Sequence, residues 1–174
     1  MAKIRNKTIQ YSVYNRDSGK PKLVGDTSSY TRPSIEALTD TVKGAGLMGE
    51  IDLPTLGQIG SMECELAFNK TNTEFIQLAA PKAHKIEVRW VTDILDSAKA
   101  SIGIEANKEI MTVIPKTAEL GDIESNETNE ATITFEVLYY QYIVAGKSVL
   151  EIDKLNNVYK VNGVDYTAKI RSAL

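Results

Sequence analysis

ATITFEVLYYQYIVA, residues 131–145, is the longest run of alternating side chains in the sequence and is typical of a β-strand. Successive side chains of a strand point to opposite faces. One face is expected to carry Ile133, Phe135, Val137, Tyr139 and Ile143. The other begins polar and becomes apolar in its second half, with Leu138, Tyr140 and Tyr142. A strand that is apolar on both faces is normally covered on both, so we expect this one to be central in a sheet or covered by a neighbouring element.

Three shorter segments show the same period of two: TIQYSVY (8–14), GSMECELAF (60–68) and KIEVRW (85–90). In the second segment Met62, Cys64, Leu66 and Phe68 alternate with Ser61, Glu63 and Glu65. This alternation predicts strands that are buried on one face and exposed to solvent on the other. The Asn162–Gly163 pair is typical of a tight hairpin turn.

Two segments break the alternation and predict short helices. In TNTEFIQLAAPK (71–82), Thr71 and Glu74 form a capping box and Pro81 is a stop signal, which predicts two to three turns. At the end of the chain, Asp165 is the expected cap of a helix over residues 166–174. We therefore expect residues 1–174 to form one α+β domain, an antiparallel β-sandwich or small barrel with a short flanking helix.

The composition is that of an ordinary globular domain, with 43% apolar and 25% charged residues in 174. The single cysteine, Cys64, has no partner for an internal disulfide, and the sequence shows neither a secretory segment nor a membrane-length apolar run. We therefore expect the chain to be made and to remain in reducing cytoplasm until another event releases it. A net charge of −3 predicts no general attraction to nucleic acid or to an anionic membrane.

Charge is unevenly distributed along the chain. Residues 1–22 carry six basic side chains (Lys3, Arg5, Lys7, Arg16, Lys20 and Lys22) against Asp17 alone. Residues 117–146 carry six acidic ones and no basic one: Glu119, Asp122, Glu124, Glu127, Glu130 and Glu136. The two segments are either solvated patches or complementary faces that dock head to tail between copies.

The sequence predicts no catalytic, cofactor or metal site. His84 is the only histidine and is expected at the surface or at the start of a strand, while Cys64 lies on an apolar strand face that protects its thiol. The segment GAGLMG (44–49) lacks the strand and capped helix of a dinucleotide-binding turn, and the Gly-Lys-Ser triplet at 146–148 lacks the earlier glycine of a phosphate-binding loop. The acidic residues of 119–130 do not have the spacing of a calcium loop.

The segment KGAGLMGEIDLPTLGQ, residues 43–58, shows no helical or strand period. It combines four glycines with apolar side chains that have no local core, so we expect a loosely ordered loop that buries them against another molecule. The residues expected to make this contact between subunits are Gly44, Gly46, Leu47, Met48, Gly49, Ile51 and Leu53.

Two stretches of the chain resemble a known family. GKSVLEIDKLNNVYKVNGVDYTAKIRSAL, residues 146–174, is similar to the C-terminal part of the major tail tube proteins of contractile-tailed phages and related phage-tail-like bacteriocins. The similarity lies in Gly146, Lys147, Glu151, Ile152, Asp153, Val161, Asn162, Gly163, Val164 and Asp165 at near-fixed spacing, and in Gly44, Ala45, Gly46 and Gly49 of the middle segment. The order of the elements between these stretches also agrees.

The resemblance implies a structural subunit whose copies close into a hexameric ring β-barrel, with rings stacked into the inner tail tube that conducts DNA or ions through the cell envelope. The implied partners are other copies of the chain, a contractile sheath protein, baseplate and tail terminator proteins, and a tape-measure protein in the lumen. The implied location is the host bacterial cytoplasm during assembly and then the tail of a virion or bacteriocin particle. No cofactor, enzymatic activity or membrane binding by the monomer is implied.

A tube that conducts DNA must not hold it, so its lumen is expected to be polar and neutral to acidic. The polar faces of the strands on either side of GAGLMG have this character and contain no lysine or arginine. We therefore expect five residues to face the lumen: Glu36, Asp40, Ser61, Glu63 and Glu65.

Three other interpretations remain open at this point. A secretion-system tube or baseplate protein shares the implied architecture. An isolated β-sandwich binding module also explains the strands, although such a module usually exposes clustered aromatic residues. An enzyme is the interpretation that the sequence favours least.

Overall fold

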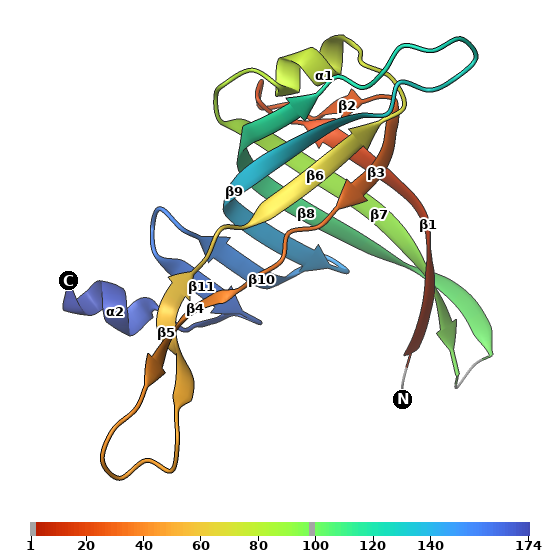
Figure 1. The fold of residues 1–174 in the computed structure, drawn as a ribbon. Coiled ribbons are helices and arrows are strands. Elements are labelled where there is room, and N and C mark those ends of the chain that lie inside the picture. Colours follow the sequence, from red (N-terminus) through yellow and green to blue (C-terminus); the bar gives the residue numbers. More distant parts are fainter. Residues whose placement is uncertain (1–2, 98–99) are drawn as a thin grey trace.

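The computed structural model describes residues 3–97 and 100–174, which form a ten-stranded sheet, a separate two-stranded hairpin and two short helices (Figure 1). The strands are β1 (Lys3–Asn15), β2 (Lys22–Val24), β3 (Thr27–Thr31), β4 (Ala37–Val42), β5 (Ile51–Ile59), β6 (Glu63–Phe68), β7 (His84–Asp96), β8 (Ser101–Glu119), β9 (Ala131–Val144), β10 (Lys147–Asp153), β11 (Val158–Val161) and β12 (Val164–Asp165). The helices are α1 (Thr73–Leu78) and α2 (Ala168–Ala173).

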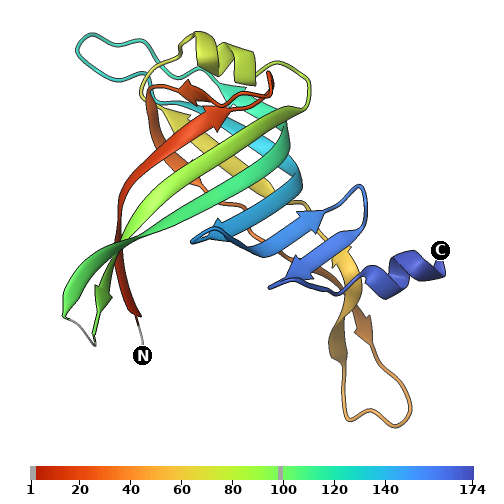
Figure 2. The ribbon, with the colours of Figure 1, turned by 180° about the vertical axis from the view of Figure 1, so that it is seen from behind.

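The large sheet is antiparallel and curls back on itself. Its strand order is β12-β11-β10-β9-β8-β7-β1-β2, and β6 branches from β9 and carries β3 on its other edge. The long strands β1, β7, β8 and β9 form one wall, and β3 and β6 cross in front of it (Figures 1 and 2). The Tyr11 hydroxyl of β1 donates a hydrogen bond to the Thr27 carbonyl of β3 at 3.1 Å. The resulting fold is a small, partly open barrel, as the alternating pattern predicts.

The apolar core fills the space between the two walls. The four residues expected on the apolar face of β6 and just before it, Met62, Cys64, Leu66 and Phe68, are all at most 2% exposed. Phe68 packs edge-on against Phe75 of α1, with ring centroids 5.2 Å apart. The predicted burial pattern of residues 60–68 is therefore confirmed.

The strand β9 is central, as predicted, but its two faces exchange halfway along. Val113 of β8 lies opposite Val137 and Thr112 lies opposite Tyr139, so Leu138 is an extra residue that forms a bulge. Beyond it Tyr140 points into the core and is 4% exposed. The prediction that Tyr139 and Ile143 share a face with Ile133 is wrong, because a one-residue bulge reverses the alternation. The bulge therefore turns even-numbered positions of the second half of the strand, Tyr140 among them, toward the core.

Both helices are present but begin later than predicted. The N-cap of α1 is Asn72, whose side chain accepts the Phe75 N–H at 2.8 Å, whereas the Thr71 hydroxyl donates to the Leu120 carbonyl at 2.7 Å. In α2 the N-cap position is Thr167 instead of Asp165. Each helix is six residues long, and no helix in the described part of the chain is long and apolar enough to span a membrane.

The segment 43–58 is only partly a loop. Ile51 begins β5 and lies opposite Val42 of β4, and Leu53 lies opposite Asp40, so these two residues belong to a regular hairpin. The strand period was hidden because Pro54 and the left-handed Gly57 (φ +74°) interrupt it. We call residues 37–59 the β4–β5 arm, which projects away from the barrel (Figure 1).

Candidate assembly surfaces

The β4–β5 arm carries a continuous set of uncovered apolar side chains. Met48 at its tip is fully exposed. Six further large apolar residues of the arm are each at least 41% exposed: Leu38, Val42, Leu47, Ile51, Leu53 and Leu56. The predicted contact glycines Gly44, Gly46 and Gly49 lie in the connecting loop. The monomer therefore leaves all seven of the predicted contact residues open to a partner.

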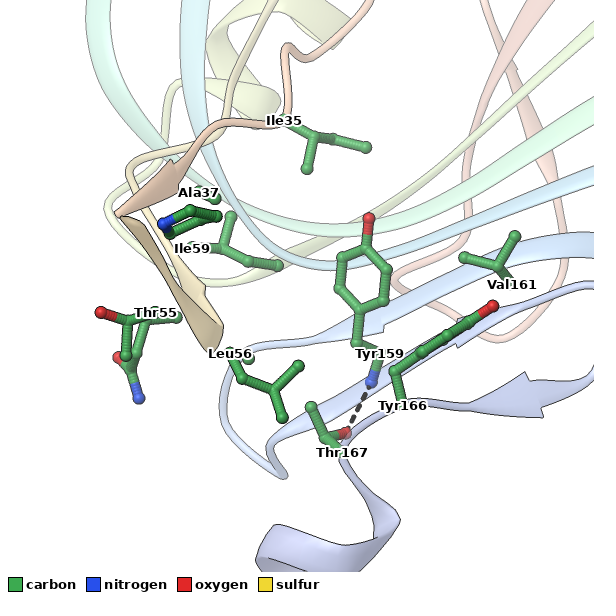
Figure 3. A pocket seen from close by; sticks show the side chains of 12 residues that line it. Ile35, Ala37, Thr55, Leu56, Ile59, Tyr159, Val161, Tyr166 and Thr167 are labelled. Carbon is green, nitrogen blue, oxygen red and sulfur yellow. Dashed lines mark hydrogen bonds between the residues drawn. The ribbon is translucent and has the colours of Figure 1, made fainter. Parts of the chain in front are cut away.

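A groove separates the base of the arm from β11, β12 and the start of α2 (Figure 3). Its volume is about 440 Å³. Ile35, Leu56 and Ile59 line one side, and Tyr159 and Tyr166, with rings 6.5 Å apart, line the other. The remaining lining residues are Ala37, Pro54, Thr55, Gly57, Gln58, Val161 and Thr167, so none of the described residues that line the groove is charged.

Gly57 fixes how closely the arm approaches α2. Its φ of +74° is strained for any other residue, and a Cβ placed there would lie 2.8 Å from Thr167 Cγ2. Thr167 cannot easily move, because its hydroxyl accepts the Tyr159 N–H at 3.0 Å (Figure 3). The groove therefore keeps its width only with glycine at this position.

Gly57→Ala is expected to lower stability by about 1–3 kcal/mol through backbone strain and to displace the arm from α2. Thermal unfolding of the purified monomer measures the first effect, and hydrogen exchange of the Tyr159 amide measures the second. Gly44→Ala is the matched control, because a Cβ there meets no atom within 4 Å and its φ is ordinary. Equal unfolding temperatures for the two variants would contradict this account of Gly57.

Asp165 holds α2 against the sheet. Its carboxylate accepts the Thr167 N–H at 3.1 Å and pairs with Arg171 Nη2 at 2.5 Å. The hydrogen bond from Arg171, aided by the Thr167 donors, lowers the pKa of Asp165 to about 2. Because this pKa is depressed in the folded state, the stabilising effect is present above the usual pKa of about 3.9 and disappears as the pH falls through about 2.

We expect the amides of α2 to keep their hydrogen-exchange protection at pH 4 and to lose it progressively toward pH 2. Asp165→Asn should weaken the hydrogen-exchange protection of the α2 amides at pH 7. It should also remove most of the loss of that protection at low pH. Asp153→Asn is a control, since that carboxylate caps the 154–156 turn and does not contact Arg171. An acid response of α2 that is unchanged in Asp165→Asn would rule out this carboxylate as its origin.

A buried polar cluster that the sequence did not predict surrounds Glu109 of β8. The carboxylate of Glu109 is inaccessible to solvent and accepts hydrogen bonds from Tyr30 Oη and Tyr140 Oη, each at 2.6 Å. Arg32 Nε lies 2.6 Å from the same carboxylate. The Arg32 guanidinium also lies over the rings of Trp90 and Tyr142, at 5.2 and 4.7 Å from their centroids.

This cluster anchors the connection from β3 to the arm. Arg32 follows β3 directly, and its ion pair with Glu109 ties that connection to the barrel interior. Burial and the Glu109 carboxylate both raise the pKa of Tyr30 and Tyr140, so both hydroxyls stay protonated and donate. Glu109 was missed because its place at an inward position of β8 emerges only from the pairing with Val88.

The five residues predicted to face a lumen fall on two different sheets. Ser61, Glu63 and Glu65 lie in and just before β6, whereas Asp40 lies in β4 and Glu36 just before it. Around β6 the Ser61 hydroxyl donates to Glu136 Oε2 at 2.5 Å, Lys154 Nζ reaches Glu136 at 2.9 Å, and Lys116 pairs with Glu63. This outward face therefore combines three carboxylates with two lysines contributed by other segments.

Much of the basic N-terminal segment is neutralised within the chain. Arg5 pairs with Glu105 at 2.7 Å, and Lys22 lies 3.4 Å from Glu74. Arg16 and Arg89 both pair with Glu87, which is inaccessible to solvent although the alternation of KIEVRW placed it on the polar face. Docking of this segment on an acidic face of another copy would thus depend chiefly on its remaining lysines.

His84 and Cys64, the two side chains considered for catalysis, are both buried in the fold. His84 begins β7, as expected, but is buried, with Nδ1 2.7 Å from Asp17 Oδ2 and Nε2 3.1 Å from the Ala80 carbonyl oxygen. The residue Cys64 is 2% exposed, and burial raises the pKa of its thiol to about 12. Within residues 3–97 and 100–174, no group of acidic, histidine or cysteine side chains could hold a metal ion.

In the described residues the barrel leaves an apolar arm uncovered and several strand edges unpaired, and such patches and edges are commonly covered by contacts with another chain. The family model described as phage tail tube protein FII matches residues 7–174. The chain belongs to this family, and its function is that of a structural tube subunit.

Individual relatives agree with this assignment. The tail tube protein of Escherichia phage P2 is 26% identical over 144 residues, covering 81% of this chain and 82% of its own. The major tail tube protein of Serratia phage KSP20 is 28% identical over 153 residues, covering 87% and 86%.

The fold is shared with solved structures of contractile injection systems. A chain in the extended sheath–tube complex of the extracellular contractile injection system PVC superposes with a TM-score of 0.50 at 14% identity, over 80% of this chain and 89% of that one. A chain in the PVC sheath/tube terminator structure gives a TM-score of 0.50 at 14% identity, over 78% and 93%.

Proposed function

We propose that six copies of the chain close into a ring, and that rings stack into the inner tube of a phage-type contractile tail. The observation that carries this proposal is the open strand edges near the two ends of the main strand order of the ten-stranded sheet. Within residues 3–97 and 100–174, the edge strand β12 pairs only with β11, and β1 is paired on its outer edge only along Val13–Asn15. Joining such edges between neighbouring copies removes them, and a head-to-tail contact closes into a ring when its rotation allows.

Electron microscopy of the purified, negatively stained protein tests this proposal. We expect rings or rods with a central hole, and six-fold symmetry in end-on class averages. Sedimentation velocity over a range of concentrations should show the same assembly in solution. A protein that stays monomeric under all conditions would contradict the proposal, and rings with another symmetry would contradict the number of subunits.

The expected partners follow from a tube inside a contractile tail. The outer surface would contact a sheath protein, the two tube ends would contact baseplate and terminator proteins, and the lumen would hold a tape-measure protein and then pass DNA. Both curated relatives are phage proteins, which supports a DNA-containing virion. Assembly would take place in the host cytoplasm, and the tube would have a mechanical function without catalysis.

We also propose that Ser61, Glu63 and Glu65 face the lumen, with Glu36 and Asp40 nearer a ring boundary on the arm. The three carboxylates Glu63, Glu65 and Glu136 outnumber the two lysines on the β6 face. Such a surface is polar and slightly acidic, so it would not bind passing phosphates.

Changing Glu63 and Glu65 to lysine should therefore leave tubes that retain DNA at low salt and release it as salt is raised. Co-sedimentation of tubes with short DNA measures the retention. The control is Glu124→Lys with Glu127→Lys, which changes the net charge equally in the exposed 120–130 loop. If both pairs of variants retain the same amount of DNA, the β6 face does not line the channel.

A further inference from the structure

The start of β1, the end of β7 and the start of β8 form a three-stranded extension (Figures 1 and 2). This extension leaves the barrel on the side away from the arm. One face of it carries a row of apolar residues in register. Ile4 lies opposite Leu95, and Leu95 lies opposite Ile102, with Ile104 two residues further along β8. Their exposures are 52%, 41%, 81% and 70% in that order.

This row is not part of the monomer core. The other face of the same extension points inward and holds the buried Ile94 and the Arg5–Glu105 ion pair. Ile4, Leu95 and Ile102 are direct cross-strand neighbours and form one patch, which is bordered by Asp93 opposite Ile104. A patch of this kind, outside any core, is characteristic of a protein–protein contact.

The segment Ser101–Ile104, which we call the tip, also has unsatisfied pairing capacity. These residues pair with β7, while the contacts of β8 with β9 begin only at Asn107. Among the described strands, one backbone edge of the tip therefore has no partner. On the other side of the molecule, β12 also has one free edge and lies next to the groove at the base of the arm.

We propose that the tip of one copy inserts Ile102 and Ile104 into the groove between the arm and β11–β12 of a second copy. This inference rests on the proposed self-assembly and adds to it the pair of surfaces that meet. The two surfaces match in chemistry, because the tip carries no charge and no charged side chain lines the groove. They lie on different sides of the monomer, so their contact is head to tail, as a closed ring needs.

Other exposed apolar residues fit this groove less well. Ile123 is 96% exposed but is flanked by Asp122 and Glu124, which would lose hydration without gaining a partner. The carboxylates beside Ile104 differ, because Glu105 is paired with Arg5 and Asp93 accepts hydrogen bonds from Asn6 Nδ2 and Lys7 N. Met48 at the arm tip lies, in the sequence, between Lys43 and Glu50, which form an ion pair. A small polar ligand is also disfavoured, since only Thr, Gln and Tyr side chains offer it hydrogen bonds in the groove.

Cysteine cross-linking tests the contact directly. The native Cys64 is buried, so it gives no background. In a chain carrying both Ile102→Cys and Leu56→Cys, oxidation of assembled tubes should give a ladder of covalent oligomers on non-reducing gels. Mixing the two single variants should give covalent dimers and nothing larger, because each chain then has one reactive thiol. The control pair Ile123→Cys with Leu56→Cys should give no ladder.

A second pair of variants covers the case in which the cysteine chains fail to assemble. Ile102→Glu with Ile104→Glu should raise the protein concentration needed for assembly by about tenfold or more, because charge is costly to bury in an apolar groove. Ile102→Leu with Ile104→Leu, which keeps the apolar character, should assemble normally. Both proteins should melt like the wild-type monomer.

The outcomes separate this inference from the proposed function. Tubes of normal form that give no ladder, or glutamate variants that assemble like wild type, would overturn the tip-to-groove contact and leave the tube function standing. A wild-type chain that never assembles would overturn both.

Discussion

Replacing Met48 and Ile51 together with serine is expected to give a folded monomer that no longer polymerises. Met48 is fully exposed and Ile51 is 45% exposed, so their loss removes little packing from the monomer. Burial of each side chain in a subunit contact would contribute about 1.5–3 kcal/mol, and this contribution recurs at every contact along a tube. Circular dichroism and thermal unfolding report the fold, and sedimentation velocity with electron microscopy reports the assembly.

The appropriate control removes equally exposed apolar groups elsewhere. Ile123→Ser with Leu155→Ser changes residues that are 96% and 75% exposed but lie outside the arm. This protein should still form tubes, because the change does not touch the proposed contact. Normal tubes from the Met48 and Ile51 variant would show that the arm does not join subunits.

The largest effect on monomer stability is expected from Arg32→Met. The change keeps an apolar stem near Trp90 and Tyr142 but leaves the inaccessible Glu109 carboxylate without its cation. Breaking a buried ion pair costs about 3–5 kcal/mol. Arg32 itself is half exposed and two tyrosine hydroxyls remain, so we expect the lower end, about 3 kcal/mol. For a chain of this length, that corresponds to a fall of about 6–12 °C in Tm.

A double-mutant cycle shows whether the lost charge pairing is the cause. Adding Glu109→Gln to Arg32→Met removes the unpaired charge while keeping a side chain of similar shape, so it should restore part of the lost stability. The control Arg89→Met affects Glu87, which keeps its contact with Arg16 at 2.7 Å, and should cost less. Additive effects in the cycle would show that Arg32 and Glu109 contribute independently.

The fold was predictable wherever one face of a strand is apolar and the other polar. The segment 60–68 is the best example, since its four apolar side chains are all buried in the core. Prediction failed at Leu138, where a bulge changes the face of each later side chain, and at Ile51, where Pro54 and Gly57 concealed a strand. Bulges and hairpins of this kind are set by pairing with a partner strand, which a local pattern does not reveal.

The candidate surfaces were predictable to a similar degree. The apolar character of Leu47, Met48, Ile51 and Leu53 correctly predicted that they lack a core in the monomer. Glu109 could not be found in this way, because its donors come from two segments far apart in the sequence, residues 30–32 and Tyr140. The groove is a product of the same long-range folding, since the arm base and Tyr166 meet only in three dimensions.

The extra residue at Leu138 constrains how relatives of this chain can change in length. Deleting it would restore plain alternation and turn Tyr140 and Tyr142 away from Glu109 and Arg32, so the deletion would disrupt the cluster and not merely shorten the strand. The connection over residues 120–130 is exposed for most of its length. It is a loop, so a change in its length does not move side chains from one face of a strand to the other. Insertions and deletions during evolution should therefore accumulate in that connection, while the number of residues between Ala131 and Val144 stays fixed.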